Sequence, residues 1–132
     1  MRLVYIAGPY SAPTYRETQH NVQAARDLGL EYLKAGYAIY IPHTMIAHCE
    51  DEVSYGAYMA QCFEVIRRCD VIALLPGWED SPGAAREKEK AEEYGLDVHE
   101  HFSKDPGCSF TRQRKYAAPQ DVYPPLGIKD FA

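Results

Sequence analysis

Residues 71–87, which read VIALLPGWEDSPGAARE, contain the clearest structural signals in the chain. The first five residues form an uninterrupted apolar run, which is typical of a buried strand. A loop of Gly, Pro and Ser follows, and a helical pattern then continues to Gly95. The stretch therefore predicts a strand, a loop and a helix, in that order.

Glu87 occupies an unusual position in this predicted helix. At about 100° per residue, one narrow stripe of the helix contains Ala84, Glu87, Ala91 and Tyr94. We expect this stripe to face the sheet, which places a carboxylate in buried surroundings. Burying a carboxylate is costly unless it has partners or a function. Two interpretations stay open: Glu87 bonds a neighbouring loop and serves only the structure, or Glu87 reacts with a ligand.

Similar alternation of strands and helices covers most of the chain. Strand signals occupy residues 2–7, 37–41, 70–75 and, more weakly, 96–102. Helix signals occupy residues 14–36, residues 54–68 and the segment that ends at Gly95. Such alternation implies parallel strands with right-handed crossovers. We expect a three-layer, flavodoxin-like (Rossmann-like) α/β domain over residues 1–102, with four to five strands in the order 2-1-3-4(-5) and helices on both faces.

Three local signals add detail to this expectation. Thr14 and Glu17 have the spacing of a capping box, so a helix should begin there. Pro42 follows the second strand and indicates a loop. The helix over residues 54–68 should turn Tyr55 inward together with Ile66.

Composition excludes several classes of protein. The 132 residues suffice for one domain with a hydrophobic core but not for two. The net charge of -5 argues against general binding of a nucleic acid polymer. No apolar run approaches a membrane span and no signal peptide is recognisable, so we expect a cytoplasmic protein without a membrane partner. In that compartment the four cysteines, none in a CxxC pair, are expected to be free thiols.

The expected strand order places a binding crevice. The order 2-1-3-4 reverses direction between the first and third strands, and ligands of such sheets bind outside the carboxyl ends at that reversal. Two glycine-bearing loops meet there, residues 8–14 and residues 76–83. Both lead into helix N-termini, where free amides and the helix dipole favour an anion. The sequence thus predicts a phosphate or sugar pocket, with Glu87 about one turn below the second loop.

Three motifs follow one another at characteristic spacing: YIAG at residues 5–8, DVIALL at 70–75 and SPGAARE at 81–87, followed by Ala91 and Gly95. Their order resembles the nucleoside 2-deoxyribosyltransferase superfamily. The spacing of serine, glycine and glutamate is most similar to its 2′-deoxynucleoside 5′-monophosphate N-glycosidase branch. The PGWE segment at 76–79 also resembles small, largely uncharacterised bacterial and phage members. The resemblance covers about the first 100 residues.

The resemblance implies a role for each matching residue. Glu87 stands where the superfamily has its nucleophilic glutamate, and Tyr5 matches an active-site tyrosine. Ser81 and Gly83 stand where the glycosidase branch holds the 5′-phosphate. Gly8 matches a glycine that lets the substrate approach the backbone.

The first loop and the second strand supply further expected binding residues. Pro9, Tyr10 and Ser11 follow Gly8, and in the glycosidase branch the positions of Pro9 and Ser11 carry a small hydroxyl and an arginine that grip phosphate. His43, after the second strand, falls near a superfamily histidine at the pocket rim. His43 and His48 do not share a helix face, so no metal is expected, and no other cofactor is implied.

A second departure concerns the proton donor for the leaving base. The superfamily usually places an aspartate on the second helix, about eight residues before the equivalent of Asp70, and here Cys62 stands there. A thiol is a poor substitute for a carboxylic acid. Asp80, or Glu79, is an alternative catalytic acid. Trp78 lies in the same loop and either stacks on a nucleobase or serves as a lid or interface anchor.

The resulting functional hypothesis is cleavage of the N-glycosidic bond of a (2′-deoxy)nucleoside 5′-monophosphate. Glu87 would attack the anomeric carbon and form a glycosyl-enzyme ester, which water then hydrolyses. Two alternatives stay open: a nucleotide-binding or sensing domain that has lost catalysis, and base exchange between deoxynucleosides. The resemblance also implies a homodimer or higher homo-oligomer. Residues 103–132 are either a disordered tail or, as their apolar residues favour, an irregular arm on a neighbouring subunit.

Overall fold

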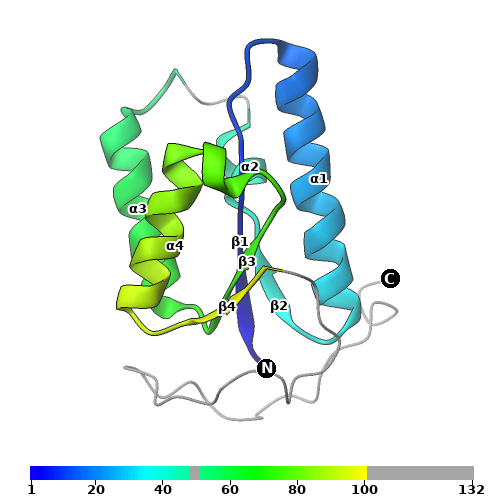
Figure 1. Cartoon of the computed structure of the whole chain (residues 1–132), viewed down its shortest axis with the longest axis vertical. Helices are drawn as coiled ribbons and strands as arrows, with labels where there is room; N and C mark the ends of the chain where they lie inside the picture. The colour runs from blue at the N-terminus through cyan, green and yellow to red at the C-terminus, as the bar shows by residue number, and fades with distance from the viewer. Residues whose placement is uncertain (48–50, 101–132) are drawn as a thin grey trace.

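The computed structural model describes residues 1–47 and 51–100. One parallel sheet runs through this part of the chain in the order β2-β1-β3-β4 (Figure 1). Its strands are β1 (Leu3–Ala7), β2 (Ala38–Tyr40), β3 (Val71–Leu74) and β4 (Asp97–His99). The expected strand order is therefore confirmed, including the reversal between β1 and β3.

Helices cover both faces of this sheet. They are α1 (Tyr15–Lys34), α2 (Pro42–Ile46), α3 (Tyr55–Arg68) and α4 (Pro82–Glu93), with a 3₁₀ turn η1 (Trp78–Asp80) before the last. Alternate residues of β1 divide the core in two, as the two-residue period of a strand requires. Tyr5 and Ala7 pack with residues of α3 and α4, whereas Val4 and Ile6 pack with α1. The expected three-layer α/β architecture is confirmed.

Several local signals are also found in the structure. Thr14 caps α1, with the Glu17 N–H donating to Thr14 Oγ1 at 3.1 Å and the Glu17 carboxylate accepting from the Thr14 N–H. Gly95, which the sequence placed at the end of a helix, has a left-handed φ of 78°. Asp70 accepts a hydrogen bond from the Leu3 N–H at 2.8 Å and thereby joins β1 to the start of β3.

Two local expectations are wrong. Pro42 does not begin a loop but stands at the first position of the short helix α2, where its missing N–H costs nothing. Tyr55 does not face the core: at the first position of α3 it is 58% exposed and borders the cavity. Met59, Cys62 and Ile66 form the buried face instead.

Some expectations concern residues outside the described ranges. These are the arm at 103–132, the end of the fourth strand at 101–102, and the residues His48, Cys49, His101 and Cys108. Within the described ranges, no helix is both long and apolar enough to cross a bilayer.

Gly8 follows β1, and its packing against Leu75 gives a structural reason for a glycine at this position. A Cβ at this position would lie 2.5 Å from Cβ and Cδ1 of Leu75, so the missing side chain makes room for the core. We expect Gly8→Ala to lower the free energy of unfolding by about 1–3 kcal/mol, the usual cost of overpacking. Denaturant unfolding measures this cost. The control is Gly56→Ala, where a Cβ meets no atom within 4 Å, and an equal loss in both variants would contradict the explanation.

Candidate active site

A cavity of about 440 Å³ opens beyond the carboxyl ends of β1 and β3, within the size range of small-molecule sites. Four segments border it: the loop after β1, helix α2, the start of α3, and the segment from Gly77 into α4. The expected site residues on its wall are Gly8, Pro9, Tyr10, Ser11, His43, Asp80, Ser81, Gly83 and Glu87. Tyr5 and Trp78 do not line the cavity, although Tyr5 contacts the lining residue Glu87.

Glu87 is the buried acid of the cavity. It stands in the second turn of α4, is 8% exposed, and accepts a hydrogen bond from the Tyr5 hydroxyl through Oε2. Burial raises the pKa of Glu87 to about 7, although the Tyr5 hydrogen bond acts in the opposite direction. Glu87 thus joins the two properties that a nucleophilic carboxylate needs, access to a cavity and one oxygen held in place.

The hydroxyl of Tyr5, on β1, donates the hydrogen bond to Glu87. Its side chain is fully buried, and its ring stacks on that of Tyr40 with centroids 5.7 Å apart. Burial first, and then the charge of Glu87, raise the pKa of Tyr5 well above 10. Tyr5 therefore remains a hydrogen-bond donor throughout the neutral range.

Two helix N-termini face the cavity. Ser81 Oγ accepts from the Ala84 N–H at 3.3 Å and caps α4, and Ser54 Oγ accepts from the Ala57 N–H at 3.1 Å and caps α3. The Ser81 hydroxyl hydrogen remains available, since the cap uses only the oxygen. Because Pro82 has no N–H, the N–H of Gly83 is the first helical amide that α4 offers to a ligand. Together with the helix dipoles, these groups favour a negatively charged or strongly polar ligand.

His43 anchors the loop after β1. It is 3% exposed, and its Nε2 lies 3.0 Å from the carbonyl oxygen of Pro9. Because a carbonyl only accepts, Nε2 must carry the hydrogen. Burial lowers the pKa of His43, which keeps the ring neutral at pH 7. The Asn21 side chain fixes the same loop by donating to the Tyr10 carbonyl at 3.0 Å.

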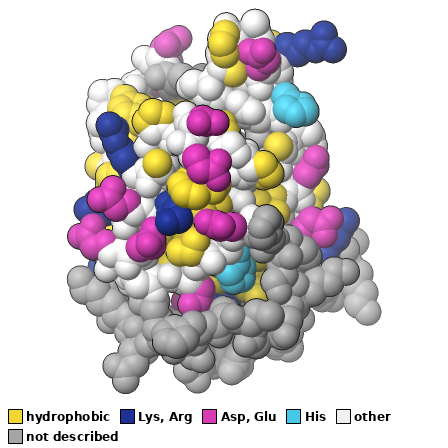
Figure 2. Space-filling view, in the orientation of Figure 1, with side chains coloured by type: hydrophobic (Ala, Val, Ile, Leu, Met, Phe, Trp, Pro, Cys, Tyr) yellow, Lys and Arg dark blue, Asp and Glu magenta, His cyan; other side chains and the backbone are white. Residues whose placement is uncertain are grey.

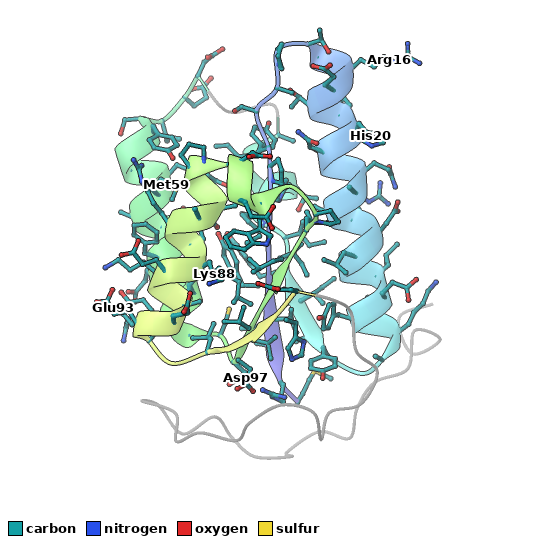
Figure 3. The ribbon with its side chains drawn as sticks, viewed as in Figure 1. Arg16, His20, Met59, Lys88, Glu93 and Asp97 are labelled. Carbon is teal, nitrogen blue, oxygen red and sulfur yellow. The ribbon has the colours of Figure 1, made fainter. Side chains whose placement is uncertain are left out.

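Trp78 is the expected binding residue that the structure does not bring to the cavity. The backbone of Gly77 has a left-handed φ of 89°, and Trp78 begins the η1 turn that follows. Its ring packs on the core, with the Lys88 ammonium 5.2 Å from the ring centroid. Lys88 is labelled beside α4 in Figure 3. Trp78 thus packs against α4 and the core and does not line the cavity.

The sequence did not identify one wall of the cavity. This wall is mainly apolar and consists of Pro42, Ile46, Val53, Tyr55, Tyr58 and Met59, from α2, α3 and the residues before α3. Met59 is labelled in Figure 3. Ser54 could have revealed this wall, since α3 has an N-cap serine like α4. An apolar wall opposite a polar one suits a ligand that has a flat ring at one end and oxygens at the other.

The charge around the cavity is negative. Among the described lining residues, Asp80 and Glu87 are acidic and none is lysine or arginine. Acidic side chains also predominate on the described part of the face shown in Figure 2. Within the same ranges, no group of three or more His, Cys, Asp or Glu side chains is arranged to hold a metal ion. An anionic group in this cavity would therefore depend on amides and hydroxyls.

One solved structure that the chain resembles is that of the CMP N-glycosidase BcmB from Clostridium botulinum. The TM-score is 0.52 and the sequence identity 18%, over 74% of this chain and 68% of that chain. At this identity the likeness shows the fold alone. It agrees with the α/β fold that the resemblance to the nucleoside 2-deoxyribosyltransferase superfamily implied.

The sequence itself identifies the family. Residues 2–100 match the model of a family described as a domain of unknown function, DUF4406. This match covers most of the chain, so the protein belongs to the DUF4406 family. A search of the curated proteins found no match.

Proposed function

We propose that the protein cleaves the N-glycosidic bond of a (2′-deoxy)nucleoside 5′-monophosphate, with Glu87 as the nucleophile. The observation that carries the proposal is a buried carboxylate on a cavity wall, with one oxygen held by Tyr5. The fold shared with a CMP N-glycosidase supports the same chemistry. In this proposal the substrate's anomeric carbon faces the oxygen of Glu87 that Tyr5 does not hold.

The two walls of the cavity suggest how the substrate lies. The base packs on the apolar wall beside Met59 and Tyr58, where ring contacts replace water. The phosphate lies at the start of α4, where the Gly83 N–H and the Ser81 hydroxyl donate to its oxygens. This orientation places the sugar between the two walls, next to Glu87.

The reaction proceeds by two displacements. In the first, the Glu87 carboxylate forms a bond to C1′ while the bond from C1′ to the base nitrogen breaks, and a proton reaches the departing base. Asp80 lines the cavity and supplies that proton in our proposal. In the second, water gives a proton to Asp80 as its oxygen bonds to C1′ and the ester bond breaks, which releases Glu87 as a carboxylate and restores the protonated Asp80. The products are the free base and the sugar 5-phosphate.

Incubation with a panel of nucleosides and their 5′-monophosphates tests this function, with free base measured by chromatography. We expect base release from monophosphates, and a covalent sugar phosphate on the peptide that contains Glu87 in acid-quenched samples analysed by mass spectrometry. Tight binding without release would refute the enzymatic function. Release that needs a second base would instead indicate base exchange.

One observation favours a second candidate, a nucleotide-binding or sensing domain. Cys62 stands at the position of the usual acidic residue, is 1% exposed, and does not line the cavity. It cannot protonate a leaving base from there. If Asp80 does not supply the proton either, the domain binds nucleotide and leaves it intact, and calorimetry would detect binding without turnover.

The pH dependence of base release follows from the state of Glu87. The nucleophile must be ionised, and its pKa is raised to about 7. We expect kcat/KM to rise with pH through about 7 and to be about tenfold lower at pH 6 than on its plateau. Initial rates with one monophosphate between pH 5 and 9 measure this rise in kcat/KM. A midpoint near 4.5, the ordinary value for a glutamate, would contradict the proposed role of burial.

Gly83 provides a test of the phosphate position with a matched control. Gly83 and Gly56 both occupy the second position of a serine-capped helix, but only Gly83 lines the cavity. A Cβ at Gly83 would lie 3.4 Å from the Tyr55 hydroxyl, an ordinary contact. Both alanine variants should therefore gain up to about 1 kcal/mol of helix stability.

Activity should separate the two variants. We expect Gly83→Ala to raise KM for a monophosphate about tenfold, because its methyl group occupies space beside the phosphate. Gly56→Ala should leave KM unchanged. Steady-state kinetics and thermal unfolding measure both properties, and an unchanged KM in Gly83→Ala would place the phosphate elsewhere.

A further inference from the structure

The hydroxyl of Tyr55 lies beside the N-terminus of a helix to which Tyr55 does not belong. Tyr55 is the first residue of α3, and its hydroxyl oxygen lies 3.4 Å from the point that a Cβ of Gly83, on α4, would occupy. Standard covalent geometry then places the Gly83 nitrogen within about 6 Å of this oxygen. Both residues line the cavity, so the Tyr55 side chain connects its apolar wall to the start of α4.

The folded chain makes no use of this hydroxyl. Tyr55 is 58% exposed, and within residues 1–47 and 51–100 its oxygen takes part in no hydrogen bond. The cap of α4 is the hydroxyl oxygen of its own Ser81, so Tyr55 is not needed there. The Tyr55 hydroxyl can therefore donate its hydrogen to a ligand in exchange for water alone.

We propose that the Tyr55 hydroxyl donates to the same phosphate group as the Gly83 N–H and thereby determines the preference for a phosphorylated ligand. The identity of the ligand rests on the function proposed above. Two donors within about 6 Å of each other suit one phosphate group, because two of its oxygens can accept from them at ordinary hydrogen-bond lengths. The ring of Tyr55 keeps its place on the apolar wall in this arrangement.

The charge of the cavity explains why this donor matters. None of the described lining residues is lysine or arginine, and two of them, Asp80 and Glu87, are acidic. A phosphate group therefore depends on neutral donors, and each hydrogen bond to a charged oxygen is stronger than one between neutral groups. Tyr55 adds a side-chain donor from α3 to those that α4 provides. Because Gly83 has no side chain, the space between the two donors remains open.

Tyr15 provides a matched control. It is the first residue of α1 and follows the N-cap Thr14, just as Tyr55 follows the N-cap Ser54 of α3. Tyr15 is also exposed, but it does not line the cavity. Tyr55→Phe and Tyr15→Phe each remove one exposed hydroxyl, and neither should change the thermal unfolding midpoint. A difference in ligand binding between them would therefore come from the cavity.

Titrations of the full chain with ribose 5-phosphate and 2-deoxyribose 5-phosphate test the proposal without any reaction. These probes carry the phosphate and the sugar of the proposed substrates but no base. We would follow the Gly83 amide by ¹H–¹⁵N NMR and expect saturable shifts with the sugar phosphates and none with unphosphorylated ribose. Tyr55→Phe should raise the Kd of the sugar phosphates about tenfold, the usual effect of losing one hydrogen bond to a charged group. Tyr15→Phe should leave it unchanged.

An unchanged Kd in Tyr55→Phe, an equal rise in Tyr15→Phe, or equal binding of ribose and its 5-phosphate would overturn the proposal. The same holds if the wild-type protein binds neither sugar phosphate. Where base release is measurable, Tyr55→Phe should raise KM for monophosphates about tenfold and leave kcat unchanged.

The two proposals fail in different ways. Base release with a Kd that is insensitive to Tyr55→Phe would uphold the proposed function and refute the role of Tyr55. Binding of the sugar phosphates that depends on the Tyr55 hydroxyl, without base release from any monophosphate, would refute the enzymatic function and uphold the role of Tyr55.

Discussion

Replacing Glu87 by glutamine is expected to abolish base release and, above pH 7, to stabilise the fold. Glutamine keeps the shape of the side chain and an acceptor for the Tyr5 hydroxyl, but its amide cannot form the glycosyl ester. We expect base release to fall by about 10³-fold or more, as is usual when a nucleophile is removed. Chromatographic detection of free base over long incubations measures the residual rate.

The gain in stability follows from the pKa of Glu87. Burial raises this pKa from 4.5 to about 7, so the folded protein binds the proton more tightly than the unfolded chain. The stability that protonated Glu87 contributes is therefore complete below about 4.5 and is lost as the pH rises through about 7. Glutamine resembles protonated Glu87 but does not titrate, so the variant keeps this stability as the pH rises. We expect a gain of about 1–3 kcal/mol in the free energy of unfolding at pH 8 and almost none at pH 4.

Glu89 supplies the control for both measurements. It lies on the same helix but is exposed, so Glu89→Gln should change neither base release nor the pH dependence of unfolding. Denaturant unfolding at pH 4, 6 and 8 would show the difference. A Glu87→Gln variant that loses stability at pH 8 would mean that the carboxylate has a cationic partner, and an active variant would exclude Glu87 as the nucleophile.

The second large effect is expected for Tyr5→Phe, which removes the hydroxyl that holds Glu87. The Tyr5 hydrogen bond stabilises the ionised form of the buried Glu87 carboxylate. Without this bond the pKa of Glu87 should therefore rise further. We expect kcat/KM to fall about 10²-fold at pH 7, as for the loss of one oriented donor. The midpoint of the pH profile should move upward in the same variant.

Tyr32→Phe is the matched control for Tyr5→Phe. Tyr32 is also fully buried, and its hydroxyl lies 2.9 Å from Nδ1 of His99 rather than next to the cavity. Its loss should cost about 1 kcal/mol of stability and leave the pH profile unchanged. If both variants shift the profile equally, the effect comes from general loosening of the core and not from the Tyr5–Glu87 bond.

The sequence was sufficient to predict the fold because its local signals agree with one another. Alternating strands and helices, the Thr14 capping box and the glycine at 95 each indicate the same arrangement. The position of Glu87 on the apolar stripe of its helix also predicted correctly that its side chain faces inward, because helical periodicity determines on which face of the helix each side chain lies.

Contacts between distant segments could not be predicted from local patterns. Tyr5 and Glu87 are 82 residues apart, and only the assembled fold brings them together. The direction of Trp78 depends on the left-handed backbone of Gly77, which the sequence permits but does not require. The apolar wall on α2 and α3 was missed for a similar reason: Tyr55 fits the helical stripe, yet in the folded chain it borders the cavity with residues of α2.

The direction of β1 has a practical consequence. Residue 1 precedes the amino end of this strand, whereas Gly8, at its carboxyl end, lines the cavity (Figure 1). A linker fused ahead of Met1 would therefore leave the protein on the side opposite to the ligand entrance. Molecules anchored to a sensor chip through such a linker would present the cavity to the flowing solution, which suits this domain to surface-based screening of small-molecule libraries.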